Sequence, residues 1–216
     1  MSLITLKNVK KEYGKNQVLF ENLSLEIEKG EFVGFVGKSG AGKTTLLNII
    51  GLITDISEGT ITIDGHQNLS MNGKNAMILR RYTIGYLFQN YGLIEDESVL
   101  WNLKLALEYK KIKKEEKLKL INKYLKQFEL NDMLNKKVYQ LSGGEQQRIA
   151  IIKLILQGSQ VILADEPTSG LDKENELIVM KLLKELNEKG ITIIMVTHNM
   201  NLCDCFSRVI NVENFR

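Results

Sequence analysis

The sequence predicts an α/β fold with a mostly parallel sheet at its core, an antiparallel β patch at the N-terminus and an inserted α-helical subdomain. Three observations predict this fold. Strand-like segments with alternating polar and apolar residues open the chain, at residues 3–9 and 17–27. The periodicity turns helical between about residues 90 and 135. Beyond residue 158, apolar runs of strand length alternate with an amphipathic helix, and such alternation implies parallel strands covered by helices.

Composition and charge bound the class of protein. Hydrophobic residues make up 44% and charged residues 25% of the 216 positions, as in ordinary soluble proteins. No apolar run approaches the roughly 18 residues of a membrane span, and the N-terminus lacks a signal-peptide pattern. Two cysteines without a secretory signal indicate the reducing cytosol, and a net charge of +3 is too small to indicate nucleic acid. We therefore expect a soluble cytosolic chain whose membrane role would come through a partner.

The N-terminal β patch is expected to form around a turn at Gly14-Lys15-Asn16. Tyr13 sits at this turn and is either a platform on which a flat base stacks or a free loop tyrosine. Gln89 follows the last element of this first part of the chain. The other elements predicted there are a strand at residues 58–65, closed by an Asp-Gly turn, a helix at residues 75–82 and a strand at residues 84–87.

A glycine-rich loop lies between an apolar, strand-like run at residues 32–36 and a helix-like run at residues 45–50. Glycines let backbone N–H groups close around phosphate oxygens, and the helix N-terminus adds partial positive charge. Lys43 would supply a charge to the β- and γ-phosphates, and the Thr44 hydroxyl would bind Mg²⁺. A bare connecting turn is the alternative. The loop fits the pattern G-x-x-x-x-G-K-[ST] and consists of Gly37, Lys38, Ser39, Gly40, Ala41, Gly42, Lys43 and Thr44.

Two helices are expected in the middle of the chain, at residues 99–109 and 114–128, where apolar residues recur at helical spacing. This part is rich in lysine. Residues 104–126 hold nine lysines against three glutamates. The helical face they form is either simply solvated or lies near anionic lipid headgroups, which attract lysine side chains.

A second glycine-bearing motif, Leu141-Ser142-Gly143-Gly144-Glu145-Gln146-Gln147-Arg148, precedes a helix expected at residues 149–156. A capping serine hydroxyl followed by unencumbered backbone N–H groups is again a geometry that binds anions. The apolar strand of residues 161–164 then presents Asp165 and Glu166 at its carboxyl end. Because ligands of open α/β sheets lie at this edge, both acids are expected near the phosphate loop.

The last part of the chain supplies a histidine and two cysteines. His198 follows a buried strand, and its place beside the acid pair indicates a functional residue more than a structural one. Cys203 and Cys205 are interpreted as helix-packing residues; a metal site with His198 is the alternative, for which no fourth ligand is apparent. The elements predicted here are an amphipathic helix at residues 175–188, a buried strand at 191–196 and a short strand at 208–212.

With these motifs in order along essentially the whole chain, the sequence resembles the ATP-binding cassette (ABC) ATPases, the motor subunits of ABC transporters. Residues 141–148 carry the resemblance most specifically, because they match the family signature. The resemblance implies the P-loop NTPase fold of the ABC ATPase type, ATP and Mg²⁺ as cofactors, and hydrolysis of ATP to ADP and phosphate. No motif position is degenerate, so we expect a hydrolytically competent site.

The resemblance also implies a role for each matching residue. Glu166 would orient and deprotonate the attacking water, Gln89 would touch Mg²⁺ or that water, and His198 would contact the γ-phosphate. The expected catalytic set is Glu166, His198, Gln89 and Lys43, and the expected metal set is Thr44, Gln89 and Asp165. The expected nucleotide-binding set is Tyr13 at the adenine, Gly37, Lys38, Ser39, Gly40, Ala41, Gly42, Lys43, Thr44 and Thr45 at the phosphates, and Ser142, Gly144 and Asp172 acting between subunits.

The resemblance further implies partners and a division of the chain. One phosphate loop covers only one face of ATP. In this family a head-to-tail dimer covers the other face with a second subunit. We expect a second copy of the chain and an integral-membrane permease as partners, no nucleic acid, and a location on the cytoplasmic face of the membrane. Residues 1–216 would be one ABC ATPase domain, with a RecA-like core and β patch at 1–88 and 159–216 and a helical subdomain at about 90–158.

Apolar residues after Gln89 are expected to form a groove for a cytoplasmic helix of the permease, because exposed apolar patches mark partner sites. The alternative is that they belong to the core of the helical subdomain. The residues concerned are Tyr91, Leu93, Ile94 and Trp101.

The cargo is narrowed only by resemblance. The compact length is similar to that of the lipoprotein-releasing, macrolide-export and antimicrobial-peptide-export ATPases. Residues 87–95 look most like the same loop in ATPases that export bacteriocins or give resistance to them, so peptide export is the expected role. Lipoprotein or lipid extraction is the near alternative and small-solute import a distant one. A role on DNA or the ribosome is disfavoured, because such ATPases usually carry a long coiled-coil insertion or a second cassette.

Overall fold

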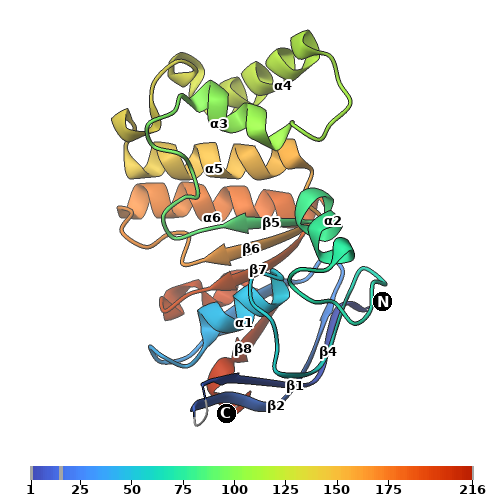
Figure 1. Cartoon of the computed structure of the whole chain (residues 1–216). Coiled ribbons are helices and arrows are strands. Elements are labelled where there is room, and N and C mark those ends of the chain that lie inside the picture. The colour runs from blue at the N-terminus through green and yellow to red at the C-terminus, as the bar shows by residue number, and fades with distance from the viewer. Residues whose placement is uncertain (1, 15–16, 216) are drawn as a thin grey trace.

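Two β-sheets, with helices between and beside them, make up the fold (Figure 1). The computed structural model describes residues 2–14 and 17–215. Lys15 and Asn16 of the expected N-terminal turn lie outside the described residues. The larger sheet has five strands in the order β5-β6-β7-β3-β8, and all its neighbouring pairs are parallel. Its strands are β3 (Phe32–Val36), β5 (Ile84–Leu87), β6 (Val161–Asp165), β7 (Thr192–Val196) and β8 (Arg208–Asn211).

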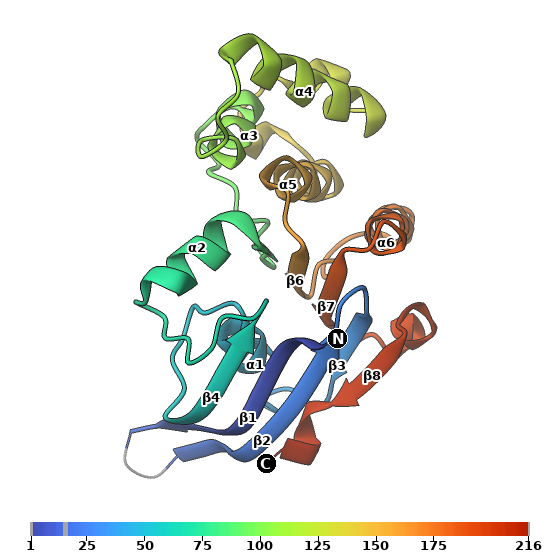
Figure 2. The same cartoon turned by 90° about the vertical axis from the view of Figure 1, so that its right-hand side faces the viewer.

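The smaller sheet is the predicted antiparallel patch, with strand order β2-β1-β4. Its strands are β1 (Ser2–Tyr13), β2 (Gln17–Glu28) and β4 (Glu58–Ile63). Helix α1 (Lys43–Ile50) lies between the two sheets (Figure 2), and its apolar residues join both in one hydrophobic core. Strand β1 extends beyond the predicted end at residue 9. Its polar residues 10–12 continue to pair, Lys10 with β4 and Lys11 and Glu12 with β2, but they hide the strand pattern in the sequence.

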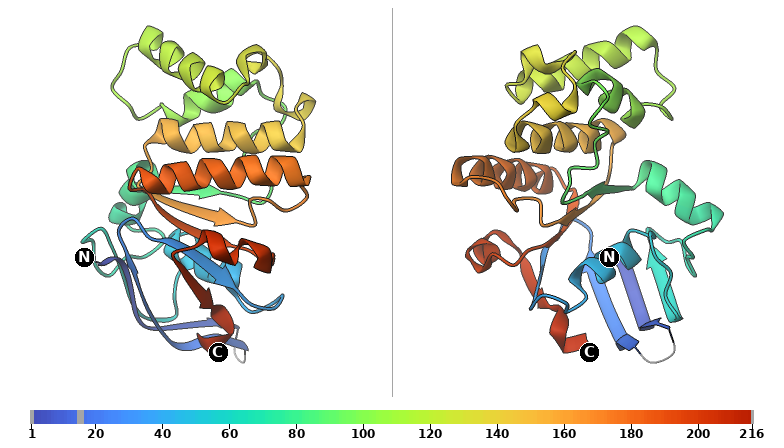
Figure 3. Two further views of the ribbon diagram at one scale, coloured as in Figure 1. Left: turned by 180° about the vertical axis from the view of Figure 1, so that it is seen from behind. Right: turned by 60° about the vertical axis from the view of Figure 1, so that its left-hand side comes forward.

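Helices cover the opposite face of the parallel sheet. There α5 (Gly143–Gln157) and α6 (Lys173–Glu188) lie side by side, as Figure 3 shows from behind. A second hydrophobic core joins these helices to the sheet and to two helices farther from the sheet. It includes Leu103, Ile121, Ile152 and Ile162. The remaining elements are α2 (Lys74–Tyr82), α3 (Val99–Ala106), α4 (Lys114–Gln127) and the 3₁₀ turns η1 (Asn131–Met133), η2 (Val138–Gln140), η3 (Met200–Cys205) and η4 (Val212–Phe215).

Helix α5 begins six residues earlier than the sequence predicts. Ser142 caps it: its Oγ accepts the Glu145 N–H at 3.3 Å, and the Glu145 carboxylate accepts the Ser142 N–H at 2.7 Å. Such a reciprocal cap satisfies two N–H groups at once and offsets the low helix propensity of the two glycines that follow. The expectation that both cysteines pack inside is wrong for Cys205, which is exposed at the end of a 3₁₀ turn.

Two further expectations concern the chain as a whole. Among residues 2–14 and 17–215, no helix is both long enough and apolar enough to span a bilayer. The two hydrophobic cores meet at the parallel sheet, one on each face. The division into a core of residues 1–88 and 159–216 and a helical subdomain of about 90–158 stays a prediction.

Candidate active site

The glycine-rich loop joins the end of β3 to α1 and takes backbone conformations that need glycine. Gly40 has φ +77° and Gly42 has φ +95°, in the left-handed region. A Cβ atom on Gly42 would lie 2.8 Å from the ring of Phe20 and 3.1 Å from Leu19. The loop therefore depends on Gly42 twice, once for its φ angle and once for its close approach to β2.

The Lys43 ammonium is folded back over this loop. Lys43 is 7% exposed, and its Nζ donates to the carbonyl oxygens of Gly37 at 2.7 Å and Lys38 at 2.9 Å. Within the described part of the chain, Lys43 forms no ion pair. Two neutral acceptors leave the charge itself uncompensated, so the ammonium retains a strong electrostatic attraction for an anion in the loop.

A cavity of about 430 Å³ opens over the loop and gathers residues from four parts of the chain. Tyr13 borders it, with its Oη 3.5 Å from Thr45 Oγ1, and so lies within reach of a nucleotide base. The cavity is lined by Tyr13, Gln17, Leu19, Ser39, Gly40, Gly42, Lys43, Thr44, Thr45, Glu166 and His198. Sequence reasoning missed Gln17 and Leu19. The pairing of Tyr13 with Gln17 across β1 and β2 brings both there, and the expected hairpin contained that signal.

Asp165 meets the loop at the carboxyl end of β6. The Thr44 hydroxyl donates to Asp165 Oδ1 at 3.1 Å. Burial raises the pKa of Asp165 and the neighbouring Glu166 charge raises it further, while the Thr44 hydrogen bond and the Lys43 charge lower it. The Thr44 hydroxyl and the Asp165 carboxylate offer oxygen ligands of the kind that Mg²⁺ prefers. A divalent cation would also stabilise the ionised form of Asp165, which burial disfavours.

Glu166 and His198 form a second pair at the same edge. His198 Nδ1 and Glu166 Oε2 are 2.7 Å apart. Glu166 has φ +47°, a left-handed conformation that is strained for a residue with a side chain, and its N–H donates to the Val196 carbonyl at 3.1 Å. Strain of this kind costs about 1–3 kcal/mol and persists where the surroundings over-determine it. The backbone thus aims the carboxylate at the cavity and at His198.

Eight residues of the expected site do not line this cavity. Four of them are next in sequence to lining residues or one position further: Gly37, Lys38, Ala41 and Asp165. The other four lie elsewhere. Gln89 is exposed beyond the end of β5, which pairs with β6. Ser142 and Gly144 lie at the N-terminus of α5. Asp172 caps α6 by accepting the Asn175 N–H at 2.8 Å. The described chain brings together the phosphate loop, the acids and His198, and leaves the signature outside.

A separate groove of about 310 Å³ lies between β5, the following loop and α5. Its exposed apolar residues are Phe88, 40% exposed and stacked on Tyr86 at 4.2 Å, and Ile53, 39% exposed. Of the four residues expected to form this groove, Tyr91 alone lines it, so that expectation is wrong for Leu93, Ile94 and Trp101. Trp101 is not a core residue either, because it is 38% exposed. Leu93 packs instead against the second hydrophobic core, and Trp101 lies on α3.

Tyr91 connects the groove to the signature. It has φ +63°, and a Cβ atom on Gly143 would lie 2.8 Å from its hydroxyl oxygen. Lys153 of α5 donates to the Gly92 carbonyl at 2.8 Å, and burial lowers the pKa of this lysine. The loop after β5 therefore packs close to the first turn of α5 and is hydrogen-bonded to its third turn.

Comparison with known proteins gives consistent matches. Residues 20–169 match the family described as ABC transporter. The chain is 41% identical over 212 residues to the macrolide export ATP-binding/permease protein MacB of Campylobacter jejuni, covering 98% of the chain and 33% of that relative. The chain thus spans about a third of the length of the MacB relatives. It is 41% identical to the uncharacterized ABC transporter ATP-binding protein MJ1508 of Methanocaldococcus jannaschii, covering 98% of the chain and 96% of that relative.

A solved structure is also similar. It is the dimeric structure of a post-hydrolysis state of the ATP-binding cassette MJ0796 bound to ADP and Pi, with a TM-score of 0.87 and 38% sequence identity. The match covers 96% of this chain and 93% of that one. Identity at this level over nearly the whole length shows a shared fold.

Because folding raises the pKa of Asp165, ionisation of this carboxyl should lower the free energy of unfolding when no nucleotide is added. A carboxyl whose pKa is raised by folding stabilises the fold below its unfolded value of 3.8 and loses that contribution as the pH rises through the folded value. Asp165→Asn should therefore raise the Tm near pH 7.5 and lose this advantage as the pH falls toward 3.8. Thermal melts across pH, with Asp204→Asn as an exposed control, measure this. A lower Tm for Asp165→Asn near pH 7.5 would contradict the assignment.

Proposed function

Because the chain belongs to the ABC transporter family, whose ATP-binding domains hydrolyse ATP, we propose that it is the ATPase subunit of a membrane transporter that exports its cargo. One observation carries the proposal most directly. Residues of the phosphate loop and the Glu166–His198 pair line a single cavity, and Asp165 is hydrogen-bonded to its lining residue Thr44. Phosphoryl transfer is catalysed mainly by positioning and by neutralising charge on the γ-phosphate, and these groups suit both tasks.

The nucleotide would lie along the cavity with its adenine at Tyr13 and its phosphates in the loop. Incoming phosphate oxygens replace the Gly37 and Lys38 carbonyls as partners of Lys43, which gains an ionic contact for two neutral ones. Thr44 and Asp165 would hold Mg²⁺ at this end. Bound there, Mg²⁺ would neutralise charge on the β- and γ-phosphates.

Glu166 is proposed as the general base that accepts a proton from the attacking water. Its carboxylate already faces the cavity, and His198 holds one of its oxygens at 2.7 Å. This contact fixes the orientation of the carboxylate and leaves its second oxygen for the water. His198 is 68% exposed at its side chain, so it can also reach the γ-phosphate. We propose that the side chain of Gln89, which follows β5, contacts the same water.

A second copy of the chain is proposed to complete the site. Ser142, Gly144 and Asp172 match the family's nucleotide-binding positions but lie outside the cavity of their own chain. Ser142 is exposed at the start of α5, where helix N–H groups attract an anion. A head-to-tail homodimer would bring this end against the nucleotide of the partner. The similar cassette MJ0796 forms a dimer with ADP and Pi bound, which supports this arrangement.

The groove beside Phe88 is the proposed docking site for a cytoplasmic helix of the permease. It is apolar and open, and the loop that lines it is fixed to the signature helix through Tyr91 and Lys153. A permease that pushes on this loop would therefore move the start of α5. Docking there would place the chain on the cytoplasmic face of the membrane.

The direction and the cargo are proposed on narrower grounds. MacB relatives are named for macrolide export, which supports outward transport. Residues 87–95 support a bacteriocin-like peptide as the cargo, with lipoprotein or lipid extraction as the alternative. Growth of cells that express the chain with its permease, challenged with a bacteriocin or with a macrolide, separates the peptide from the macrolide.

Glu166→Gln should stop turnover and keep nucleotide binding. A positioned general base contributes about 10²–10⁴-fold in rate, and the carboxamide keeps the shape while removing a repulsive charge near the γ-phosphate. Steady-state ATPase should fall by that range, and ATP should drive a stable dimer on size exclusion. Glu174→Gln on α6 is the control. Turnover at the parent rate would show that Glu166 is not the base.

Ile53→Ala with Phe88→Ala should weaken association with the permease and leave the ATPase rate of the isolated chain unchanged. Both side chains are exposed in the groove, so their truncation removes apolar contact area without opening the core. Co-purification of the tagged chain with the permease from membranes measures the loss. Leu177→Ala, which alters an exposed residue of α6, serves as control. Unchanged association of the double variant would exclude the groove as the docking site.

A further inference from the structure

Positive charge is concentrated in one part of the molecule. Residues 100–140 contain eleven lysines, no arginine and five acidic residues, a net charge of +6. Since the whole chain carries +3, the remaining residues carry −3. The excess lies on the helical part farthest from the β patch, as Figure 1 shows from the position of α3 and α4.

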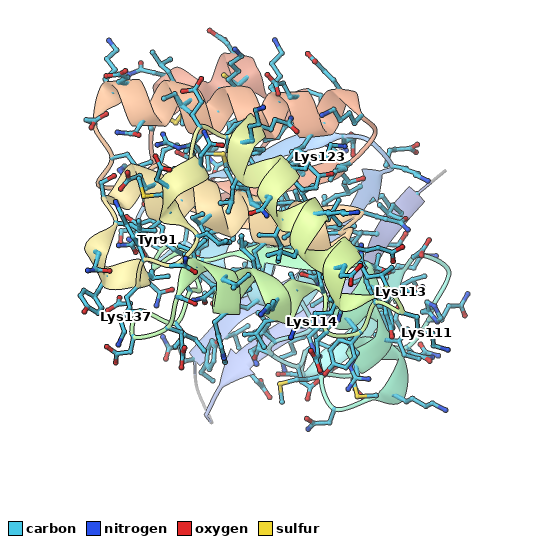
Figure 4. The ribbon with its side chains drawn as sticks, turned by 90° about the horizontal axis from the view of Figure 1, so that it is seen from above. Tyr91, Lys111, Lys113, Lys114, Lys123 and Lys137 are labelled. Carbon is cyan, nitrogen blue, oxygen red and sulfur yellow. The ribbon has the colours of Figure 1, made fainter. Side chains whose placement is uncertain are left out.

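Nine of these lysines are exposed, and five of the nine make up what we term the lysine surface: Lys111, Lys113, Lys114, Lys123 and Lys137. Figure 4 shows Lys111, Lys113 and Lys114 together near the start of α4 and Lys137 toward the other side, where Tyr91 lies. None of the five forms an ion pair with a described residue. Their charges are therefore unbalanced within the chain and available to an anionic partner.

The same segment, residues 100–140, also exposes apolar side chains. Trp101 and Leu105, four residues apart on α3, are 38% and 40% exposed, and Leu118 on α4 is 40% exposed. Tyr139 is 56% exposed, with Lys137 Nζ 6.0 Å from its ring centroid. Lysine mixed with tryptophan, tyrosine and leucine is the composition of surfaces that rest on a membrane interface.

Nucleic acid is the other polyanion that such a charge could attract. Arginine is the preferred residue for bidentate phosphate recognition, and residues 100–140 contain none. Lysine acts instead as a point charge on a flexible stem, which suits a fluid layer of headgroups. The composition therefore favours lipid over nucleic acid.

We propose that the lysine surface binds the anionic phosphodiester headgroups of the membrane that surrounds the permease. The inference rests on the proposed function, because docking at the groove is what brings this part of the chain near a bilayer. Each lysine near an anionic surface strengthens binding by at most about fivefold. Several together hold the chain weakly and reversibly, orienting it for the permease without replacing the permease as the anchor.

Vesicle flotation of the purified chain tests the proposal without the permease. The probes are vesicles of phosphatidylcholine alone and vesicles with about one-third phosphatidylglycerol, at low and at high salt. The chain should bind the anionic vesicles at least about tenfold more tightly, and high salt should remove the difference. Equal binding to both kinds of vesicle at low salt would overturn the proposal.

A matched pair of triple variants locates the effect. Lys111, Lys113 and Lys114→Gln should weaken binding to anionic vesicles by at least about tenfold, since each lysine contributes up to about fivefold. The control replaces Lys181, Lys184 and Lys189, three exposed lysines on and after α6, by Gln and removes the same charge. It should change binding by less than about twofold. Equal losses in both variants would mean a general charge effect and would overturn the proposal.

Two further readouts separate the alternatives. Duplex RNA or DNA that binds more tightly than anionic vesicles, and that loses binding in the same α4 variant, would assign the surface to nucleic acid instead. The basal ATPase rate should be unchanged in both variants, because none of the six lysines lies in the nucleotide site. If the parent chain does not bind anionic vesicles but has normal ATPase activity and associates with the permease, the lipid inference alone is overturned. Intact vesicle binding in a chain without ATPase activity or permease association would count against the proposed function.

Discussion

Parallel pairing of β6 with β7 and of β7 with β3 is the constraint on which the whole site depends. Strands that run the same way end at the same edge, so the loops that leave β3, β6 and β7 converge. Thr44 and Asp165 are 121 positions apart in the chain and are hydrogen-bonded there. Glu166 and His198 meet at the same edge from neighbouring strands. A shift in this register would separate every group that the chemistry requires.

The electrostatics of the site suit a ligand that carries both an anion and a cation. Lys43 is buried against neutral carbonyls, and Asp165 is a carboxylate whose ionisation burial opposes. Each charge is costly alone, and they lie too far apart to form an ion pair. ATP with its cation would satisfy both, because the phosphates offer anionic oxygens to the lysine and the cation offers positive charge to the acid. Binding energy and folding energy are thus linked at one edge of the sheet.

Much of the fold could be predicted because each motif sits on the element that its chemistry requires. The phosphate loop lies between a buried strand and a helix, and the acid pair follows an apolar strand. Both patterns predict parallel α/β topology. The start of α5 could not be predicted from propensity, since the reciprocal cap of Ser142 and Glu145 is a contact between side chain and backbone. The prediction that Trp101 lines the groove was wrong for a similar reason. Trp101 is exposed on α3, and tertiary packing decides the direction of its side chain.

The candidate site was predictable where residues are close in sequence and less so where strands bring distant ones together. Gln17 and Leu19 reach the cavity through the pairing of β1 with β2, which the expected hairpin implies but no nucleotide-binding motif includes. Conversely, the motif that names Ser142 and Gly144 does not say which copy of the chain they serve. Their place outside the cavity of their own chain is what a site shared between two copies requires.

Mixed dimers of two inactive variants test whether the site is shared. Lys43→Ala disables the phosphate-loop half and Ser142→Arg blocks the signature half, so each variant alone should be nearly inactive. Random pairing at equal concentrations makes about half of the dimers mixed, and each mixed dimer holds one intact site of two. The ATPase rate of the mixture should therefore recover to about a quarter of the parent rate for independent sites. Full ATPase activity of Ser142→Arg alone in the assembled complex would contradict a site shared between two chains.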